Sequence, residues 1–224
     1  MRCLSIAIFL VLVGCVHENT LVAQSDARPV DPLAPPVANA FARVERVASQ
    51  ILPVAQRFCR EHNPTMPLSY CEFRLEVDRA IGPRPNAYQA IGNDGRPIIA
   101  VNPAMMLSLE NDDEAAFLLA HEAGHQIASH VLKARLSAVS ATKGFLPKSS
   151  LDPSSHGHYR EFDPRIAELE ADKLGALVAR AAGFDPRRGA NVLNRLSPFS
   201  DATLTHPGVG RRLEVIGRAI AQAM

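Results

Sequence analysis

The residues best suited to chemistry lie in one short stretch near the middle of the chain, His121-Glu122-Ala123-Gly124-His125. On an α-helix, residues four apart lie one above the other on the same face, so the imidazoles of His121 and His125 can converge on one metal ion. Glu122 then lies beside that ion as a candidate general base. A five-residue pattern recurs by chance, so the surrounding sequence decides whether it marks a site.

A catalytic zinc centre takes three protein ligands and a water, so the two histidines need a third ligand. The sequence Glu-Leu-Glu-Ala-Asp offers Glu168, Glu170 and Asp172. Residues two apart on a helix point in nearly opposite directions, so Glu168 and Glu170 cannot both face one metal. Glu168 and Asp172 share a face, which favours Glu168 as ligand and Asp172 as acceptor for a histidine N–H. Two alternatives stay open: Glu170 as ligand, and a helix face whose carboxylates are only solvated.

Both stretches are predicted to lie on helices. Asn111 or Asp112 caps a helix that carries the histidines and runs past His130, to about residue 140. His130 follows His125 by five residues, so on one continuous helix it points away from the metal face. A second helix begins at Asp163-Pro164 and ends at Gly183.

The remaining pattern predicts an α+β fold that is mostly helical, with a small three-stranded sheet beside the motif helix. Alternating or β-branched segments predict the strands, and Asn93-Asp94-Gly95 predicts a tight turn between two of them. Pro53 is expected to kink or break the first helix. The predicted strands are 71–78, 87–91 and 97–101, and the other predicted helices are 37–58, 103–109, 186–196 and 208–224.

Composition favours one globular domain and argues against nucleic acid as a partner. The chain has 224 residues, 47% of them apolar, and a formal net charge of +1. A chain of this length and composition can bury a sizeable core. It has no run of Lys or Arg, no tryptophan and few other aromatic residues, so a basic groove with base-stacking rings is not expected.

The amino-terminal residues predict export and a lipid anchor. Residues 1–14 are a short basic start and an apolar run too short for a membrane span, which indicates a signal peptide. The run ends in Leu-Val-Gly-Cys, which resembles the bacterial lipobox and predicts lipidation of Cys15. Residues 15–36 are then a lipidated, proline-rich tether, and 37–224 form the domain. The alternative is an ordinary signal peptide with an incidental cysteine.

Two cysteines remain for the domain, and they predict a disulfide. Cys59 and Cys71 form an even pair once Cys3 is removed with the signal and Cys15 is acylated. An oxidising periplasm would allow them to join. Metal ligation by these cysteines has little support, because no Cys-x-x-Cys or neighbouring histidine accompanies them.

Taken together, the motifs resemble the HtpX and CAAX-prenyl-endopeptidase family of zinc metallopeptidases, and more narrowly its soluble periplasmic BepA/LoiP-type branch. The motif His-Glu-Ala-Gly-His followed by Glu-x-x-x-Asp carries the resemblance, which covers roughly residues 40–222. The membrane-spanning helices of integral members and the long repeat domain of some periplasmic relatives are absent. Supporting matches are Pro85-Asn86-Ala87-Tyr88, Val101-Asn102, Ala-Gly-Phe-Asp-Pro at 182–186, Thr205-His206-Pro207 and Arg212.

The resemblance implies a zincin-like metallopeptidase domain of the gluzincin type, with one Zn²⁺ per chain. It implies Glu122 as general base, with His206 close to the zinc as a fourth ligand, a gate or an oxyanion stabiliser. Arg212 would stand behind the ligands, or be a structural partner of an acidic residue.

The same resemblance implies polypeptide substrates, namely misfolded or unassembled envelope proteins, cleaved at the periplasmic face of the outer membrane. The alternative is a non-proteolytic, chaperone-like or binding factor whose zinc site is closed by His206.

Overall fold

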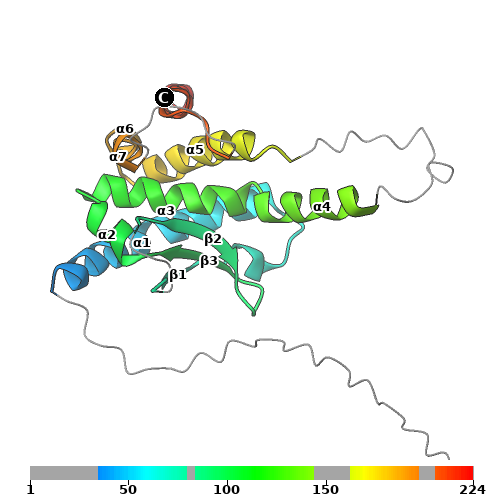
Figure 1. The fold of residues 1–224 in the computed structure, drawn as a ribbon, viewed down its shortest axis with the longest axis horizontal. Coiled ribbons are helices and arrows are strands. Elements are labelled where there is room, and N and C mark those ends of the chain that lie inside the picture. The colour runs from blue at the N-terminus through cyan, green and yellow to red at the C-terminus, as the bar shows by residue number, and fades with distance from the viewer. Residues whose placement is uncertain (1–34, 80–83, 144–161, 197–204, 224) are drawn as a thin grey trace, which may run out of the picture. The chain divides into compact units, whose positions relative to one another are not determined.

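The computed structural model describes residues 35–79, 84–143, 162–196 and 205–223 of the chain (Figure 1). The predicted signal peptide, Cys15 and nearly all of the predicted tether lie outside these ranges. Within them, no helix combines the length and the apolar character needed to cross a bilayer.

The fold is α+β and mostly helical, as predicted, with a single small sheet among the described residues. Helix α3 lies between α1 on one side and α5 on the other, and it contacts strands β2 and β3 (Figure 1). The elements are α1 (Pro35–His62), a 3-10 turn η1 (Leu68–Cys71), β1 (Arg74–Val77), β2 (Ala87–Ile91), β3 (Pro97–Val101), α2 (Pro103–Ser108), α3 (Asp112–Ile127), α4 (His130–Lys143), α5 (Pro164–Ala181), α6 (Pro186–Gly189), α7 (Val192–Leu196) and α8 (Val209–Gln222).

The sheet has the strand order β1-β3-β2, so β2 is an outer strand. Strand β3 pairs parallel with β1 and antiparallel with β2. The predicted turn joins β2 to β3, and Gly95 takes a φ of 77°, which a residue with a side chain rarely adopts. Of the two outer strands, β2 is the one that lies along α3.

Helix α3 is buried on nearly every side, which explains why its sequence is so rich in small and apolar residues. Residues 114–124 are all buried, and α3 is the element that joins the sheet to the other helices. A helix with apolar residues all around it is typical of the centre of a domain. The side-chain oxygen of Asn111 caps α3 by accepting a hydrogen bond from the backbone N–H of Glu114 at 3.1 Å.

Helices α3 and α5 approach each other through two glycines. A Cβ added at Gly124 would lie 2.8 Å from the carbonyl oxygen of Ala171, and one added at Gly175 would lie 2.8 Å from the backbone nitrogen of His121. Backbone atoms cannot yield to such contacts without moving the helices apart. The two glycines therefore set the distance between the helix that bears the histidines and the helix that bears the carboxylates.

Helix α1 differs from the prediction at Pro53, because it continues unbroken through that proline to His62. A proline inside a helix costs about 3 kcal/mol. The apolar side of α1, including Val47, Ile51 and Ala55, is completely buried. This burial, mainly against α3, offsets the cost. The end of α1 is joined to η1 by a disulfide between Cys59 and Cys71.

Two predicted helices are interrupted in the structure. The motif helix ends at Ile127 and a separate helix begins at His130, with Ser129 between them at a left-handed φ of 59°. The predicted helix 186–196 is likewise divided into α6 and α7. The first interruption, at Ser129, follows the second motif histidine, His125, by four residues.

We predict that Gly175→Ala lowers stability and weakens metal binding, because its Cβ would collide with the backbone of His121. Overpacking of this kind costs about 1–3 kcal/mol. Thermal unfolding of the metal-free variant, followed by circular dichroism, measures the loss. Gly210→Ala on α8 is the matched control, because its Cβ meets nothing within 4 Å. Equal stability of Gly175→Ala and Gly210→Ala would contradict the close-packing account.

Candidate metal centre

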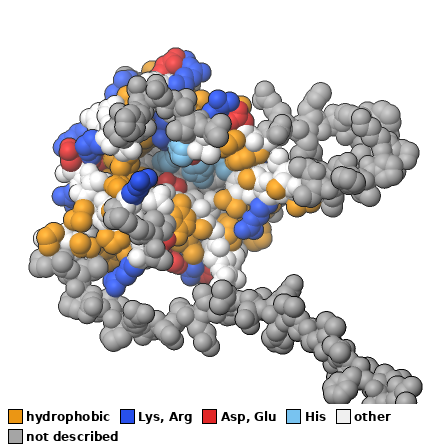
Figure 2. Space-filling view, in the orientation of Figure 1, with side chains coloured by type: hydrophobic (Ala, Val, Ile, Leu, Met, Phe, Trp, Pro, Cys, Tyr) orange, Lys and Arg blue, Asp and Glu red, His pale blue; other side chains and the backbone are white. Residues whose placement is uncertain are grey.

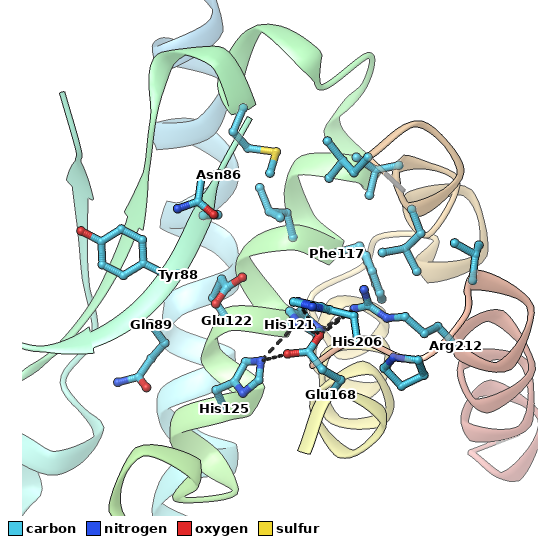
Figure 3. Close-up of a pocket in the computed structure, with 18 of the residues that line it drawn as sticks. Asn86, Tyr88, Gln89, Phe117, His121, Glu122, His125, Glu168, His206 and Arg212 are labelled. Carbon is cyan, nitrogen blue, oxygen red and sulfur yellow. Dashed lines mark hydrogen bonds and ion pairs between the residues drawn. The ribbon is translucent and has the colours of Figure 1, made fainter. Parts of the chain in front are cut away.

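Three side chains from two helices converge on one point, as Figure 3 shows. His121 and His125 lie on α3, and Glu168 lies one turn into α5. The Nε2 atoms of the two histidines are 3.3 Å apart. Glu168 places Oε2 at 3.6 Å from Nε2 of His121 and Oε1 at 3.3 Å from Nε2 of His125. Among the described residues, these three form a group whose ligand atoms all lie within 4.8 Å of one another.

These separations fit a zinc ion. Ligand atoms at about 2.1 Å from a tetrahedral zinc lie about 3.3–3.4 Å from one another. The two histidine nitrogens have this spacing, and so do Nε2 of His125 and Oε1 of Glu168. The donor set, two imidazoles and one carboxylate, is also the one found in catalytic zinc sites that keep a position open for water.

His121 is held in place by a buried acidic residue on α5. Its Nδ1 lies 3.0 Å from Oδ1 of Asp172, whose side chain is completely buried. Arg212, from α8, donates two hydrogen bonds to the same carboxylate, at 2.7 Å to Oδ1 and 2.8 Å to Oδ2. Because the Nδ1–H of His121 is directed at a carboxylate, its Nε2 lone pair stays available to a metal.

The acidic residues of the centre are ionised, and the reason is the same for both. Burial raises the pKa of Asp172, but the hydrogen bonds from Arg212 and His121 outweigh it and lower the pKa to about 2. Burial also raises the pKa of Glu168, while His125, His121 and Arg212 together lower it to about 2. A carboxylate that stays ionised near neutral pH is the form that binds a metal ion.

Glu122 lies in the wall of a cavity of about 550 Å³ that opens onto the three ligands. Its side chain lies between the histidines and strand β2 (Figure 3). The cavity is hollowed into the surface, with the histidines at its base and apolar side chains around it (Figure 2). A carboxylate at this position can take a proton from a water or donor held near the metal ligands.

His206 lies at the rim of the same cavity, just before α8. Its Nε2 is 3.7 Å from Oε2 of Glu168, and its side chain is 56% exposed. The convergent group of described residues does not include His206. Arg212, the other residue singled out near the carboxyl end, contacts both Asp172 and, at 3.5 Å, Oε2 of Glu168.

His130 has a position that differs from the prediction, whereas Glu170 points away from the ligands as the favoured assignment of Glu168 requires. His130 does not point away from the metal face: its Nδ1 lies 3.0 Å from Nδ1 of His125. Glu170 does not face the ligands, and instead lies 3.1 Å from Nε2 of His130. The position of His130 results from the interruption at Ser129, where the sequence has no glycine or proline to indicate a break.

Comparison with known proteins relates this site to a known peptidase family. Residues 41–147, just under half of the chain and including the two histidines and Glu122, match the model of Peptidase family M48. Over that stretch the chain is similar to this peptidase family.

Two curated proteins that are similar to this chain are named as metalloendopeptidases. The chain is 28% identical to "Mitochondrial metalloendopeptidase OMA1" of Arabidopsis thaliana over 54% of its own length and 27% of that protein. It is 29% identical to the protein of the same name from Schizosaccharomyces pombe, over 70% of its length and 49% of that protein. The chain thus spans about a quarter and about half of these relatives.

We predict that Asp172 stabilises the metal-free protein most above pH 4 and progressively less towards pH 2. Its pKa falls from 3.8 to about 2 on folding, so the unfolded chain takes up the proton first as the pH drops. Urea unfolding of wild type and Asp172→Asn between pH 6 and pH 2 measures this contribution. The stability difference should shrink across that window; a difference independent of pH would contradict the assigned pairing.

Proposed function

We propose that this protein is a zinc-dependent endopeptidase. The observation that carries the proposal is the geometry of the cavity, in which two imidazoles and Glu168 converge while the Glu122 carboxylate lies beside them. The match to Peptidase family M48 and the metalloendopeptidase names of the relatives support it.

The reaction needs a metal and a base, and the cavity offers a place for each. Zinc, when bound, polarises the peptide carbonyl and lowers the pKa of a water molecule towards neutrality. His121, His125 and Glu168 would hold it. Glu122 would accept the proton of the attacking water on its carboxylate and then give that proton to the amine that leaves.

An extended polypeptide fits the cavity because an outer strand forms one wall. Residues 86–89, the start of β2 and the residue before it, line the cavity beside Glu122. In the described sheet β2 pairs with β3, which leaves its other edge towards the cavity. A substrate strand could pair with that edge through main-chain hydrogen bonds, a mode that selects extended chain rather than a particular sequence.

The part of the cavity away from β2 is lined by apolar side chains, and this lining indicates which polypeptides it accepts. Phe117 and Leu118 line it from the turn of α3 that precedes His121, and residues of α7 and α8 complete it. Such a wall accepts side chains that a folded protein buries. We therefore propose unfolded or unassembled polypeptides as substrates. The apolar lining residues are Met105, Phe117, Leu118, Val131, Val192, Leu193, Leu196 and Val209.

A closed, non-proteolytic zinc site is not favoured by the geometry. In such a site His206 would occupy the fourth position, whereas its exposed imidazole stands outside the convergent group. From the rim of the cavity, His206 could instead donate a hydrogen bond to the oxyanion that forms on the substrate. We propose this second role for His206.

We propose the bacterial cell envelope as the place of action. The curated relatives are named as mitochondrial, so this proposal rests on the chain's own amino-terminal sequence, with its apolar run and Cys15. The disulfide between Cys59 and Cys71 is consistent with an oxidising compartment. A lipid on Cys15 would hold the domain at the periplasmic face of the outer membrane.

We predict that Glu122→Gln abolishes proteolysis and leaves zinc content unchanged, because it removes the base and keeps all three ligands. Loss of a general base costs about 10²–10⁴-fold in rate. Cleavage of unfolded casein together with the zinc-to-protein ratio measures both effects. Glu45→Gln, at an exposed position on α1, is the matched control and should cleave like wild type.

Two results would contradict the proposed function. One is a Glu122→Gln variant that cleaves casein as fast as wild type. The other is a wild-type protein that holds one zinc and cleaves nothing, before and after His206→Ala.

In source cells, the Glu122→Gln protein should fractionate with the outer membrane and retain uncleaved envelope proteins. Its recovery from the cytosol would contradict the proposed location.

A further inference from the structure

A chain of two hydrogen bonds extends from His125 to the protein surface. Nδ1 of His125 lies 3.0 Å from Nδ1 of His130, and Nε2 of His130 lies 3.1 Å from Oε2 of Glu170. The His125 and His130 rings meet edge to face, with centroids 5.0 Å apart. The side chain of His130 is only 4% exposed, whereas that of Glu170 is 46% exposed.

The direction of these hydrogen bonds follows from the ligand geometry. Nε2 of His125 faces His121 and Glu168, so its lone pair serves the metal. A neutral imidazole has one donor and one acceptor, so Nδ1 of His125 carries the proton. It donates a hydrogen bond to Nδ1 of His130. His130 must then carry its own proton on Nε2, which donates to the carboxylate of Glu170. Each bond in the chain has one possible direction.

The backbone is shaped to bring His130 to this position. On an uninterrupted helix, residues five apart differ by about 140° around the axis. Ser129 instead adopts a left-handed φ of 59°, a conformation that glycine usually supplies at the end of a helix. The Tyr70 hydroxyl donates to Oγ of Ser129 at 2.9 Å, Ser129 donates to Asn63 at 3.0 Å, and Asn63 donates to the carbonyl of Ile127 at 2.9 Å.

We propose that His130 is a positioning residue for the metal centre, which fixes the ring orientation and the tautomer of His125, and that Glu170 fixes the tautomer of His130. The proposal rests on the metal site of the proposed function and not on proteolysis. The two metal-binding histidines are thus supported differently: His121 by the buried Asp172–Arg212 pair, and His125 by an imidazole whose own partner reaches solvent.

The test measures zinc affinity directly, by competition with a chromophoric chelator. His130→Phe keeps a buried ring against Phe162, whose centroid is 6.2 Å away, but cannot accept the proton of His125. Loss of such an outer partner weakens metal binding by about 10–100-fold. His130→Asn keeps an acceptor oxygen near the place of Nδ1 and should restore affinity to within a few-fold of wild type. Glu170→Ala should weaken binding less than His130→Phe does.

Two further readouts separate positioning from plain packing. The visible absorption of the Co²⁺-substituted protein reports ligand geometry, and it should shift in His130→Phe and return in His130→Asn. His62→Phe, at an exposed histidine near the end of α1, is the matched control and should bind zinc like wild type. If His130→Phe does not fold, His130→Asn and Glu170→Ala carry the test.

Three outcomes would overturn the proposal. The first is wild-type zinc affinity and an unchanged Co²⁺ spectrum in His130→Phe, even with lowered thermal stability. The second, if His130→Phe does not fold, is wild-type affinity in Glu170→Ala or loss of zinc in His130→Asn. The third is a wild-type chain that binds no zinc, which would overturn the proposed metal site as well. Zinc binding with the predicted affinities but no casein cleavage would overturn only the proposed function.

Discussion

Helix α3 lies so close to helix α5 that no side-chain carbon fits at Gly124 or Gly175. This contact brings Glu168 within reach of both histidines, because Glu168 lies on the helix that packs directly against the helix of His121 and His125. The burial of α3 serves the same end. Helix α3 packs against α1 and along the sheet, and this burial holds it rigidly in place. The two imidazoles therefore project from a fixed backbone.

The close contact also buries charge, and the carboxyl-terminal helix compensates for it. Glu168 and Asp172 would be costly to ionise inside the domain without a cation nearby. Arg212 on α8 pairs with Asp172 through two hydrogen bonds and reaches Glu168 as well. Helix α8 therefore belongs to the site, although residues 41–147, which match the family model, end before α5 and α8 begin.

Sequence reasoning was most successful where chemistry depends on spacing within one element. The four-residue spacings of His121 with His125 and of Glu168 with Asp172 each place two side chains on one face, and the structure has both pairs in that arrangement. The three strands, and the caps at Asn111 and Asp163, follow from local patterns in the same way. The confirmed α+β fold needed only these local signals.

The sequence was uninformative where tertiary contacts override local preference. The first helix passes through Pro53 because burial of its apolar side outweighs the lost hydrogen bond. The motif helix stops at Ile127, where Asn63, just after α1, and Tyr70 of η1 form hydrogen bonds with Ser129, which has a left-handed φ. No local pattern contains those partners, so the placement of His130 against His125 could be found only in three dimensions.

The most direct test of the account is a crystal structure of the Glu122→Gln protein with bound zinc, with the ion located by anomalous scattering. The account predicts one zinc ligated by Nε2 of His121, Nε2 of His125 and the Glu168 carboxylate, with the remaining position open to water or substrate. A zinc ligated by Glu170, or one closed by His206 as a fourth protein ligand, would contradict it.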